Sequence, residues 1–207
     1  MNGSQSHWEE IYAHRDPQLA SWHEPAPQIS LAVIDDLALP RDAGIIDVGG
    51  GTSSLAQALL EAGYADITVA DISSSSIQRA KAHVGDDAQR IGWVQADVRS
   101  HDFGRRYDLW HDRAVFHFMV DPADRDRYLN VLRCTLRVGG HAILATFGPD
   151  GPTRCSGLPV DRYDASKPSQ ILAPDFVAVS SRLYDHETPA GARQQFLYLL
   201  ARRTSEP

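Results

Sequence analysis

Short apolar runs alternate with segments of helical periodicity through residues 27–147. The runs are predicted to be buried strands, at residues 45–48, 66–71 (DITVAD), 91–97 (IGWVQAD), 107–112 (YDLWHD) and 141–147 (HAILATF). The segments between them are predicted to be helices, over residues 27–37, 52–62, 73–84 and 123–137. Because strands that are joined through helices run parallel, this pattern predicts an α/β fold with helices on both faces of a parallel sheet.

The predicted helices carry start and stop signals and apolar faces. Pro27 opens the first helix, Gly63 stops the second, and the serines before Ile77 supply an N-cap for the third. The expected apolar faces are Ile29, Val33 and Leu37, then Ile77, Ala80 and Val84, and finally Tyr128, Leu132 and Leu136.

The C-terminal part of the chain follows a different pattern. The segments DFVAVSSRLYD and RQQFLYLLARR flank HETPAG, which leaves little room for a helix between them. They predict an antiparallel hairpin at the edge of the sheet. Residues 148–164 are predicted to be a long loop, and loops of this length usually have a function or are mobile.

Length and composition favour one globular domain. The chain has 207 residues, of which 43% are hydrophobic, and a formal net charge of −7, so we expect no nucleic acid or anionic membrane as a partner. No apolar stretch reaches the length of a membrane span, and MNGSQSHWEE has no pattern of a secretory signal. Cys134 and Cys155 are too few for a disulfide framework. A cytoplasmic location is therefore expected.

The stretch IIDVGGGTSSL places three glycines directly after the first buried strand. Such a turn approaches a phosphate, a dinucleotide or a ligand without phosphate. No lysine follows as a P-loop requires, and Ser54 stands where a dinucleotide fingerprint has its third glycine. The carboxylate of Asp47 would repel a pyrophosphate but attract a cationic ligand.

Two more acids end the next two strands. Asp71 follows Gly51 by 20 residues, where a carboxylate can accept from both hydroxyls of a ribose, and Asp97 ends the third strand, where it can accept from an adenine amino group. Each acid has a structural alternative: Asp47 as a helix cap, Asp71 as a turn former and Asp97 as a solvated strand end. Their joint order favours a binding site for a nucleoside that carries positive charge.

Four segments, IIDVGGG, VADIS, VQADV and LRVGGHAILATF, resemble the class I S-adenosylmethionine-dependent methyltransferases over roughly residues 40–201. The resemblance implies a Rossmann-like, seven-stranded, mostly parallel sheet with an antiparallel last strand. It also implies S-adenosylmethionine as the cofactor, S-adenosylhomocysteine as its product and a methyltransferase activity of class EC 2.1.1. The cofactor-binding residues it implies are Asp47, Gly49, Gly50, Gly51, Asp71, Ile72, Asp97 and Val98.

The segment HDRAVF is similar to the one after the fourth strand in thiopurine methyltransferase-like enzymes that act on small molecules. That resemblance implies Asp112 as a cofactor-binding residue and Arg113 as a catalytic residue near the acceptor, and favours a thiol or another sulfur or selenium nucleophile. His111 departs from the pattern, because an aromatic residue is expected there.

The N-terminal pattern W-x-x-x-Y…W is similar to a lid over the cofactor in such families. Residues 1–40 are therefore predicted to be a helical lid segment and residues 41–207 the methyltransferase domain. Trp22 would contact the cofactor, with Trp8 and Tyr12 adding apolar surface. The alternative is that these aromatic residues only anchor an N-terminal helix to the core.

The acceptor decides whether the reaction needs a base. For a thiol, Arg113 would favour the thiolate, whereas for an amine or hydroxyl His117 is the predicted proton acceptor, with a structural histidine as the alternative. No third ligand joins His111 and Asp112, so we expect no metal. Cys134 is expected among core-facing residues, and Cys155 is predicted to pack or to line the substrate site.

Other functions stay open from the sequence. They are methylation of a protein lysine, non-catalytic binding of S-adenosylmethionine and, with less support, an NAD-dependent oxidoreductase. A small-molecule acceptor is favoured, but neither its identity nor the oligomeric state follows from the sequence.

Overall fold

A computed structural model describes residues 5–14, 16–164 and 166–205. Its main feature is a seven-stranded sheet in the order β3-β2-β1-β4-β5-β9-β8. The strands are β1 (Gly44–Val48), β2 (Asp66–Asp71), β3 (Ile91–Gln95), β4 (Tyr107–Arg113), β5 (Leu136–Phe147), β8 (Phe176–Glu187) and β9 (Arg193–Arg203). The pairs among β1 to β5 are parallel, and β9 is antiparallel to both β5 and β8. The predicted fold class is confirmed.

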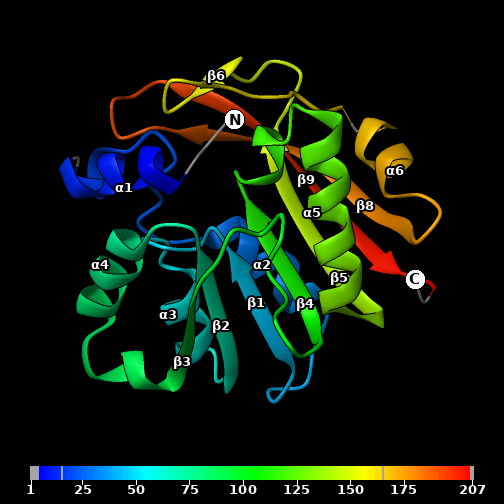
Figure 1. Ribbon diagram of the computed structural model, residues 1–207, viewed down its shortest axis with the longest axis horizontal. Helices are drawn as coiled ribbons and strands as arrows, with labels where there is room; N and C mark the ends of the chain where they lie inside the picture. Colours follow the sequence, from blue (N-terminus) through cyan, green and yellow to red (C-terminus); the bar gives the residue numbers. More distant parts are fainter. Residues whose placement is uncertain (1–4, 15, 165, 206–207) are drawn as a thin grey trace.

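Helices flank this sheet (Figure 1). They are α1 (Gln5–His14), α2 (Gln28–Asp36), α3 (Leu55–Glu61), α4 (Ser74–Val84), α5 (Pro122–Thr135) and α6 (Ser166–Leu172), with short 3-10 turns η1 (Pro17–Leu19), η2 (Gly85–Arg90) and η3 (Phe116–Phe118). Figure 1 shows α1 and the short strand β6 (Arg154–Cys155) at the end of the sheet toward which β4 and β5 point. This is the edge where open α/β sheets bind ligands. Among the described residues, no helix combines the length and the apolar character that crossing a membrane requires.

The core lies along the central strands because they are apolar on both faces. Every residue of β1 is buried, and Ile45, Ile46 and Leu109 have no exposed surface. Such strands are continuous apolar runs in the sequence, which is why their positions were predictable.

Two helix predictions need correction. The helix predicted to reach residue 137 ends at Thr135, because Leu136 already has an extended backbone and begins β5. In α2 the fully buried residues are Ser30 and Ile34, whereas the predicted stripe of Ile29, Val33 and Leu37 is only partly buried. Ser30 faces the sheet because its hydroxyl meets the ring of His111, 2.9 Å away.

The predicted loop over residues 148–164 contains a small hairpin, β6 (Arg154–Cys155) paired with β7 (Leu158–Pro159). Helix α6 follows it and was not predicted, because its seven residues show no clear apolar period. The Asp164 carboxylate caps it by accepting from the backbone N–H groups of Ser166 and Lys167. The predicted C-terminal hairpin is confirmed: β8 and β9 pair from Phe176 with Arg203 to Glu187 with Arg193.

Candidate functional site

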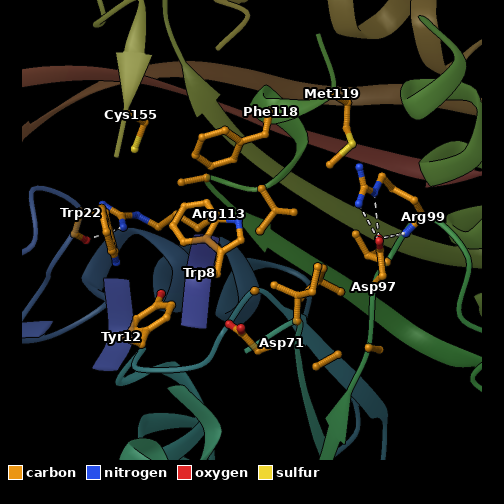
Figure 2. Close-up of a pocket in the computed structure, with 18 residues that line it drawn as sticks. Trp8, Tyr12, Trp22, Asp71, Asp97, Arg99, Arg113, Phe118, Met119 and Cys155 are labelled. Atoms are coloured by element: carbon orange, nitrogen blue, oxygen red, sulfur yellow. Dashed lines mark hydrogen bonds and ion pairs between the residues drawn. The ribbon is translucent and has the colours of Figure 1, made fainter. Parts of the chain in front are cut away.

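A cavity lies at the carboxyl edge of β1, β2, β3 and β4 and is covered by α1 and by η3 (Figure 2). The predicted site residues that line it are Gly49, Asp71, Ile72, Asp97, Val98, Arg113 and Trp22. Asp47 and Gly50 line an adjoining cavity, which shares Gly49, Trp22 and Arg113 with the first. Gly51, Asp112 and His117 line neither cavity.

The glycine turn is tightly packed on both sides. Gly49 has a φ of +67°, and a Cβ atom there would lie 2.1 Å from Val115. A Cβ atom at Gly50 would lie 2.2 Å from Asp47 Oδ2, and one at Gly51 would lie 2.6 Å from Asp71 Oδ2. The backbone therefore passes directly over two carboxylates, an approach that residues with a side chain cannot make.

Asp71 ends β2 with its carboxylate toward the cavity (Figure 2). One oxygen accepts from the backbone N–H of Gly51 at 3.1 Å and the other from that of Ser73 at 2.8 Å. Burial raises the pKa of this carboxyl to about 6, although these hydrogen bonds favour the ionised form. The site thus holds an acceptor that gains from further donors, such as a pair of hydroxyl groups.

Asp97 follows β3, the neighbour of β2, and lies beside Arg99 in the lining of the cavity (Figure 2). Burial acts to raise the pKa of its carboxyl, but hydrogen bonds from the side chain and backbone of Arg99 outweigh burial and hold the pKa below its usual range. Arg99 donates to one carboxylate oxygen from Nε and to the other from Nη2, at 2.9 Å and 2.6 Å. With the backbone N–H of Arg99 at 3.0 Å, three of about four acceptor positions are used, and one stays open to a ligand.

Asp47 lies under the glycine turn in a buried pair with His111. Its Oδ1 is 2.7 Å from His111 Nδ1, and both side chains are 2% exposed. The other ring nitrogen of His111 contacts the Ser30 hydroxyl, which fixes the ring. Asp47 Oδ2 has no hydrogen-bond partner among the described residues, so one buried carboxylate oxygen is available beside the second cavity.

Arg113 anchors the N-terminal segment rather than standing free. Its guanidinium donates to the carbonyl of Trp22 and to Glu24 Oε1, both at 2.8 Å, and to the Tyr198 hydroxyl at 3.2 Å. It also lies over the ring of Phe196, 4.7 Å from its centroid. Because Glu24 neutralises it, Arg113 adds little free positive charge to the cavity.

Asp112 turns away from both cavities. Its carboxylate accepts from the backbone N–H groups of Val115 and Phe116 and from the Tyr128 hydroxyl. Burial raises the pKa of this carboxyl to about 6. Asp112 therefore fixes the turn that brings η3 over the cavity.

His117 is completely buried between Phe118 and Phe147, with ring centroids 4.5 Å and 4.6 Å away. Neither ring nitrogen has a hydrogen-bond partner among the described residues. Burial, with a contribution from Arg113, lowers the pKa of His117 to about 3. The structural alternative for this histidine was a side chain hydrogen-bonded to backbone; the ring is buried, but its nitrogens make no such bond within the described residues.

The cysteines have opposite environments. Cys155 is buried and lines the main cavity, and burial raises the pKa of its thiol to about 11. Cys134 is exposed, so the prediction that it faces the core is wrong; it sits on the solvent side of α5. No group of three or more His, Cys, Asp or Glu within the described residues is arranged to hold a metal ion.

The predicted aromatic residues of the N-terminal segment do come together. Trp8 lies against Trp22 and Phe118, with ring centroids 6.3 Å and 5.2 Å away, and Tyr12 also lines the cavity. Glu9 fixes this helix to α4: its carboxylate accepts from the N–H groups of Ser74 at 2.5 Å and Ser75 at 3.2 Å.

Several residues of the site were not identified from the sequence. They are Arg99, Phe118, Met119, Glu9 and Glu24. Arg99 follows Asp97 by two residues, a spacing that can signal an ion pair at a strand end. Phe118 and Met119 belong to an apolar run that gives no sign of which residue faces a ligand.

The fold is the Rossmann-like methyltransferase fold, and residues 45–140 match the model of a family described as a methyltransferase domain. Both findings support the predicted superfamily of class I S-adenosylmethionine-dependent methyltransferases. The more specific resemblance to thiopurine methyltransferase-like enzymes stays a prediction.

The chain resembles particular methyltransferases over part of their length. It is 30% identical over 109 residues to malonyl-[acyl-carrier protein] O-methyltransferase 1 of Ilyobacter polytropus, a match that covers 52% of this chain and 39% of that protein. It is 34% identical over 121 residues to the ubiquinone/menaquinone biosynthesis C-methyltransferase UbiE of Paracoccus denitrificans, covering 56% and 47%. The chain thus spans less than half the length of these curated relatives.

A solved structure shares the fold over nearly the whole chain. It is the 1,6-didemethyltoxoflavin-N1-methyltransferase of Burkholderia thailandensis with bound 1,6-didemethyltoxoflavin and S-adenosylhomocysteine, at a TM-score of 0.72 and 22% identity over 97% of this chain and 87% of that chain. The three proteins are named for methyl transfer to oxygen, carbon and nitrogen, so similarity does not identify the acceptor atom.

Proposed function

We propose that this protein transfers a methyl group from S-adenosylmethionine to a small-molecule acceptor. The observation that supports this most is the placement of Asp71 and Asp97 on one cavity, at the ends of adjacent parallel strands. Each retains acceptor capacity, one for a pair of ribose hydroxyls and the other for an adenine amino group.

The other cofactor residues take their roles from position. Ile72 and Val98 follow the two acids and supply apolar surface around the base. The glycine turn at residues 49–51 gives close backbone approach, and Asp47 Oδ2 offers negative charge to the ammonium and sulfonium end. Trp22 closes the cavity on the side of the reacting methyl group.

When bound, S-adenosylmethionine supplies a methyl group on positively charged sulfur, which becomes a neutral thioether once the acceptor's lone pair has formed the new bond to carbon. The chain's contribution is alignment and exclusion of water, which can lower a barrier by ~7–11 kcal/mol. Trp8, Trp22 and Phe118 supply the walls that keep water out.

The described residues that line the cavity include no histidine or free carboxylate on the acceptor side. His117 is sealed in the core, and Arg113 is held by Glu24, so we propose that Arg113 positions Trp22 and that neither residue moves a proton. The acceptor would then be a nucleophile that loses its proton to water, and a thiol or selenol meets this condition best. Asp112 would support the site only through the turn at residues 115–116.

Calorimetry with S-adenosylhomocysteine and with NAD tests the first half of the proposal. We expect binding of S-adenosylhomocysteine alone, and the Asp71→Ala variant should bind it ~1.5–3 kcal/mol more weakly, because hydrogen bonds to a charged group are lost. Asp66→Ala at the other end of β2 is the matched control, since its carboxylate pairs with Arg105 far from the cavity. Preferential binding of NAD would contradict the proposal.

A transfer screen tests the second half. Thiols, amines, carboxylates and a cell protein extract are each incubated with radiolabelled S-adenosylmethionine, and label on small molecules is the expected result. Label on protein alone would instead support a protein methyltransferase, the second candidate. Binding without transfer to any acceptor would support a non-catalytic binding protein.

A further inference from the structure

The acceptor side of the main cavity is apolar. Besides the two acids, its lining includes five aromatic or sulfur-containing side chains, Trp8, Trp22, Phe118, Met119 and Cys155. Arg99 also lines the cavity, but its guanidinium is paired with Asp97 and Asp124. Figure 2 shows Phe118 and Cys155 on the side of the cavity opposite Asp71. The positive charge of Arg113 is neutralised by Glu24 at 2.8 Å, and the two side chains are 12% and 17% exposed. A charged acceptor would therefore lose water there and gain no partner of opposite charge.

A third space, a hollow beside the N-terminal segment, adjoins the main cavity. It encloses about 490 Å³ between the N-terminal segment and the turn that joins β6 to β7, and its lining includes Ile11, Leu19 and Ser156. Tyr12 and Trp22 line both this hollow and the main cavity, so the two spaces adjoin. Its volume falls within the range of pockets that hold small organic molecules.

The mouth of this hollow carries an exposed apolar side chain. Leu19 is 75% exposed, and η1 holds it in place because the Asp16 carboxylate accepts from the N–H of Gln18 at 2.9 Å. The Asp16 carboxylate also lines the hollow and keeps its charge in that cap, but it is exposed to solvent and stays hydrated. The rest of the lining offers an acceptor apolar surface and hydroxyl groups.

Given the proposed function, on which this step rests, we propose that the acceptor, apart from its reacting thiol or selenol, is an uncharged, ring-containing apolar molecule that enters between the N-terminal segment and the β6–β7 turn. Its reactive end lies among Trp22, Phe118 and Cys155, and its distal end lies along Leu19. Aromatic walls favour a flat ring, because rings gain from stacked and edge-to-face contacts beyond their buried area.

Three matched product analogues test the charge preference without requiring turnover. They are the thioethers 4-(methylthio)toluene, 4-(methylthio)benzoate and 4-(methylthio)benzylammonium, titrated into the protein saturated with S-adenosylhomocysteine. The uncharged thioether should bind roughly tenfold more tightly than either charged one, because a buried charge would lack a partner. Equal or tighter binding of a charged analogue, or no binding of any of the three, overturns the proposal.

The route is tested by the Leu19→Asp variant. It should weaken binding of 4-(methylthio)toluene by about fivefold, because apolar contact at the mouth is replaced by a hydrated charge. Val138→Asp is the matched control, since Val138 is also an exposed apolar residue, 44% exposed, but lies at the far end of β5. Equal effects of the two variants would overturn the route. If the unaltered protein did not bind S-adenosylhomocysteine, that result would instead count against the proposed function itself.

Discussion

The cavity has two halves, and the chain builds them in different ways. The nucleoside half consists of acids that follow β2 and β3, whose parallel register pairs Asp71 with Gln95 and so brings Asp97 to the same edge. The acceptor half consists of side chains from α1, the segment around Trp22, η3 and β6, which are far apart in the sequence. The first half follows from the sheet alone, whereas the second depends on separate anchoring contacts.

Those anchors are polar, and Arg113 itself lines the cavity, whereas Asp112 lies outside it. Arg113 and Glu24 hold the segment around Trp22, and Asp112 holds the turn before η3. The difference between the halves therefore implies that variants of the anchors disturb acceptor binding or folding, while variants of the cavity acids disturb cofactor binding.

The largest effect is expected from Asp112→Ala. Loss of the carboxylate leaves the buried N–H of Phe116, the part-buried N–H of Val115 and the Tyr128 hydroxyl without their acceptor. The free energy of unfolding should therefore fall by ~3–5 kcal/mol. Urea denaturation measures this change. Asp87→Ala is the control, because its exposed ion pair with Arg90 contributes at most ~1 kcal/mol. A small effect at Asp112 would show that the acceptor half does not depend on this anchor.

A smaller effect in the same half is expected from His117, whose burial should make the free energy of unfolding depend on pH. The folded state keeps the pKa of His117 near 3 by burial, while the unfolded chain takes up the proton at its ordinary value near 6.5. Stability should therefore fall as the pH drops below 6.5, by ~2 kcal/mol at pH 5 from this residue. His117→Phe should lose this component, whereas His83→Gln at the exposed end of α4 should keep it. Urea denaturation at pH 6.5 and pH 5 measures the free energy of unfolding of the unaltered protein and the two variants. An equal loss of stability between these pH values in all three proteins would contradict the role of His117.

In the nucleoside half, pH should act on binding through Asp71. Burial raises the pKa of this carboxyl to about 6, and hydroxyl donors favour its ionised form, so affinity for S-adenosylhomocysteine should be constant above pH 7 and fall below pH 6. The loss is roughly tenfold at pH 5, because one proton must be displaced. The Asp71→Asn variant should bind S-adenosylhomocysteine weakly, with an affinity that does not change with pH. The Asp112→Asn variant should keep the pH dependence of the unaltered protein, since Asp112 lines neither cavity. A profile unchanged by Asp71→Asn would assign the titration to another group.

The same contrast explains what the sequence could reveal. The strands β1 to β5 and the acids Asp71 and Asp97 were predictable because apolar runs and the residues after them are local features. The orientation of His111, Asp112 and Arg113 was not predictable from the sequence. Successive side chains of a strand face opposite sides, and the sequence does not say which side carries the cavity. Asp112 thus points toward Tyr128, while His111 and Arg113 face Ser30 and Trp22.

Contacts that join distant segments were also beyond the sequence. The pairing of Arg113 with Glu24 and the contact of Trp8 with Phe118 depend on how the N-terminal segment crosses the sheet edge. Nothing in the local pattern around residues 22–24 indicates a partner on β4. Helix α6 and the β6–β7 hairpin are short elements whose stability comes from packing rather than from their own propensity.

Glu9 joins the two halves, and its variant gives the smallest expected effect. Its carboxylate caps the first turn of α4, directly after Ile72, so α1 and the ribose side are held together. Glu9→Ala should lower the free energy of unfolding by ~1 kcal/mol, the usual contribution of such a cap. Because Ser73 still caps this helix through Ser76, the loss should not be larger.

The same variant should weaken binding of S-adenosylhomocysteine by up to about fivefold, if closure of α1 over the cavity contributes to affinity as the position of Trp8 implies. Glu10→Ala on the same helix is the matched control, because that side chain is exposed. Calorimetry with S-adenosylhomocysteine on both variants shows whether affinity falls together with stability. If Glu9→Ala loses stability but not affinity, the cap holds α1 without closing the cavity, and the two halves are linked only through the sheet.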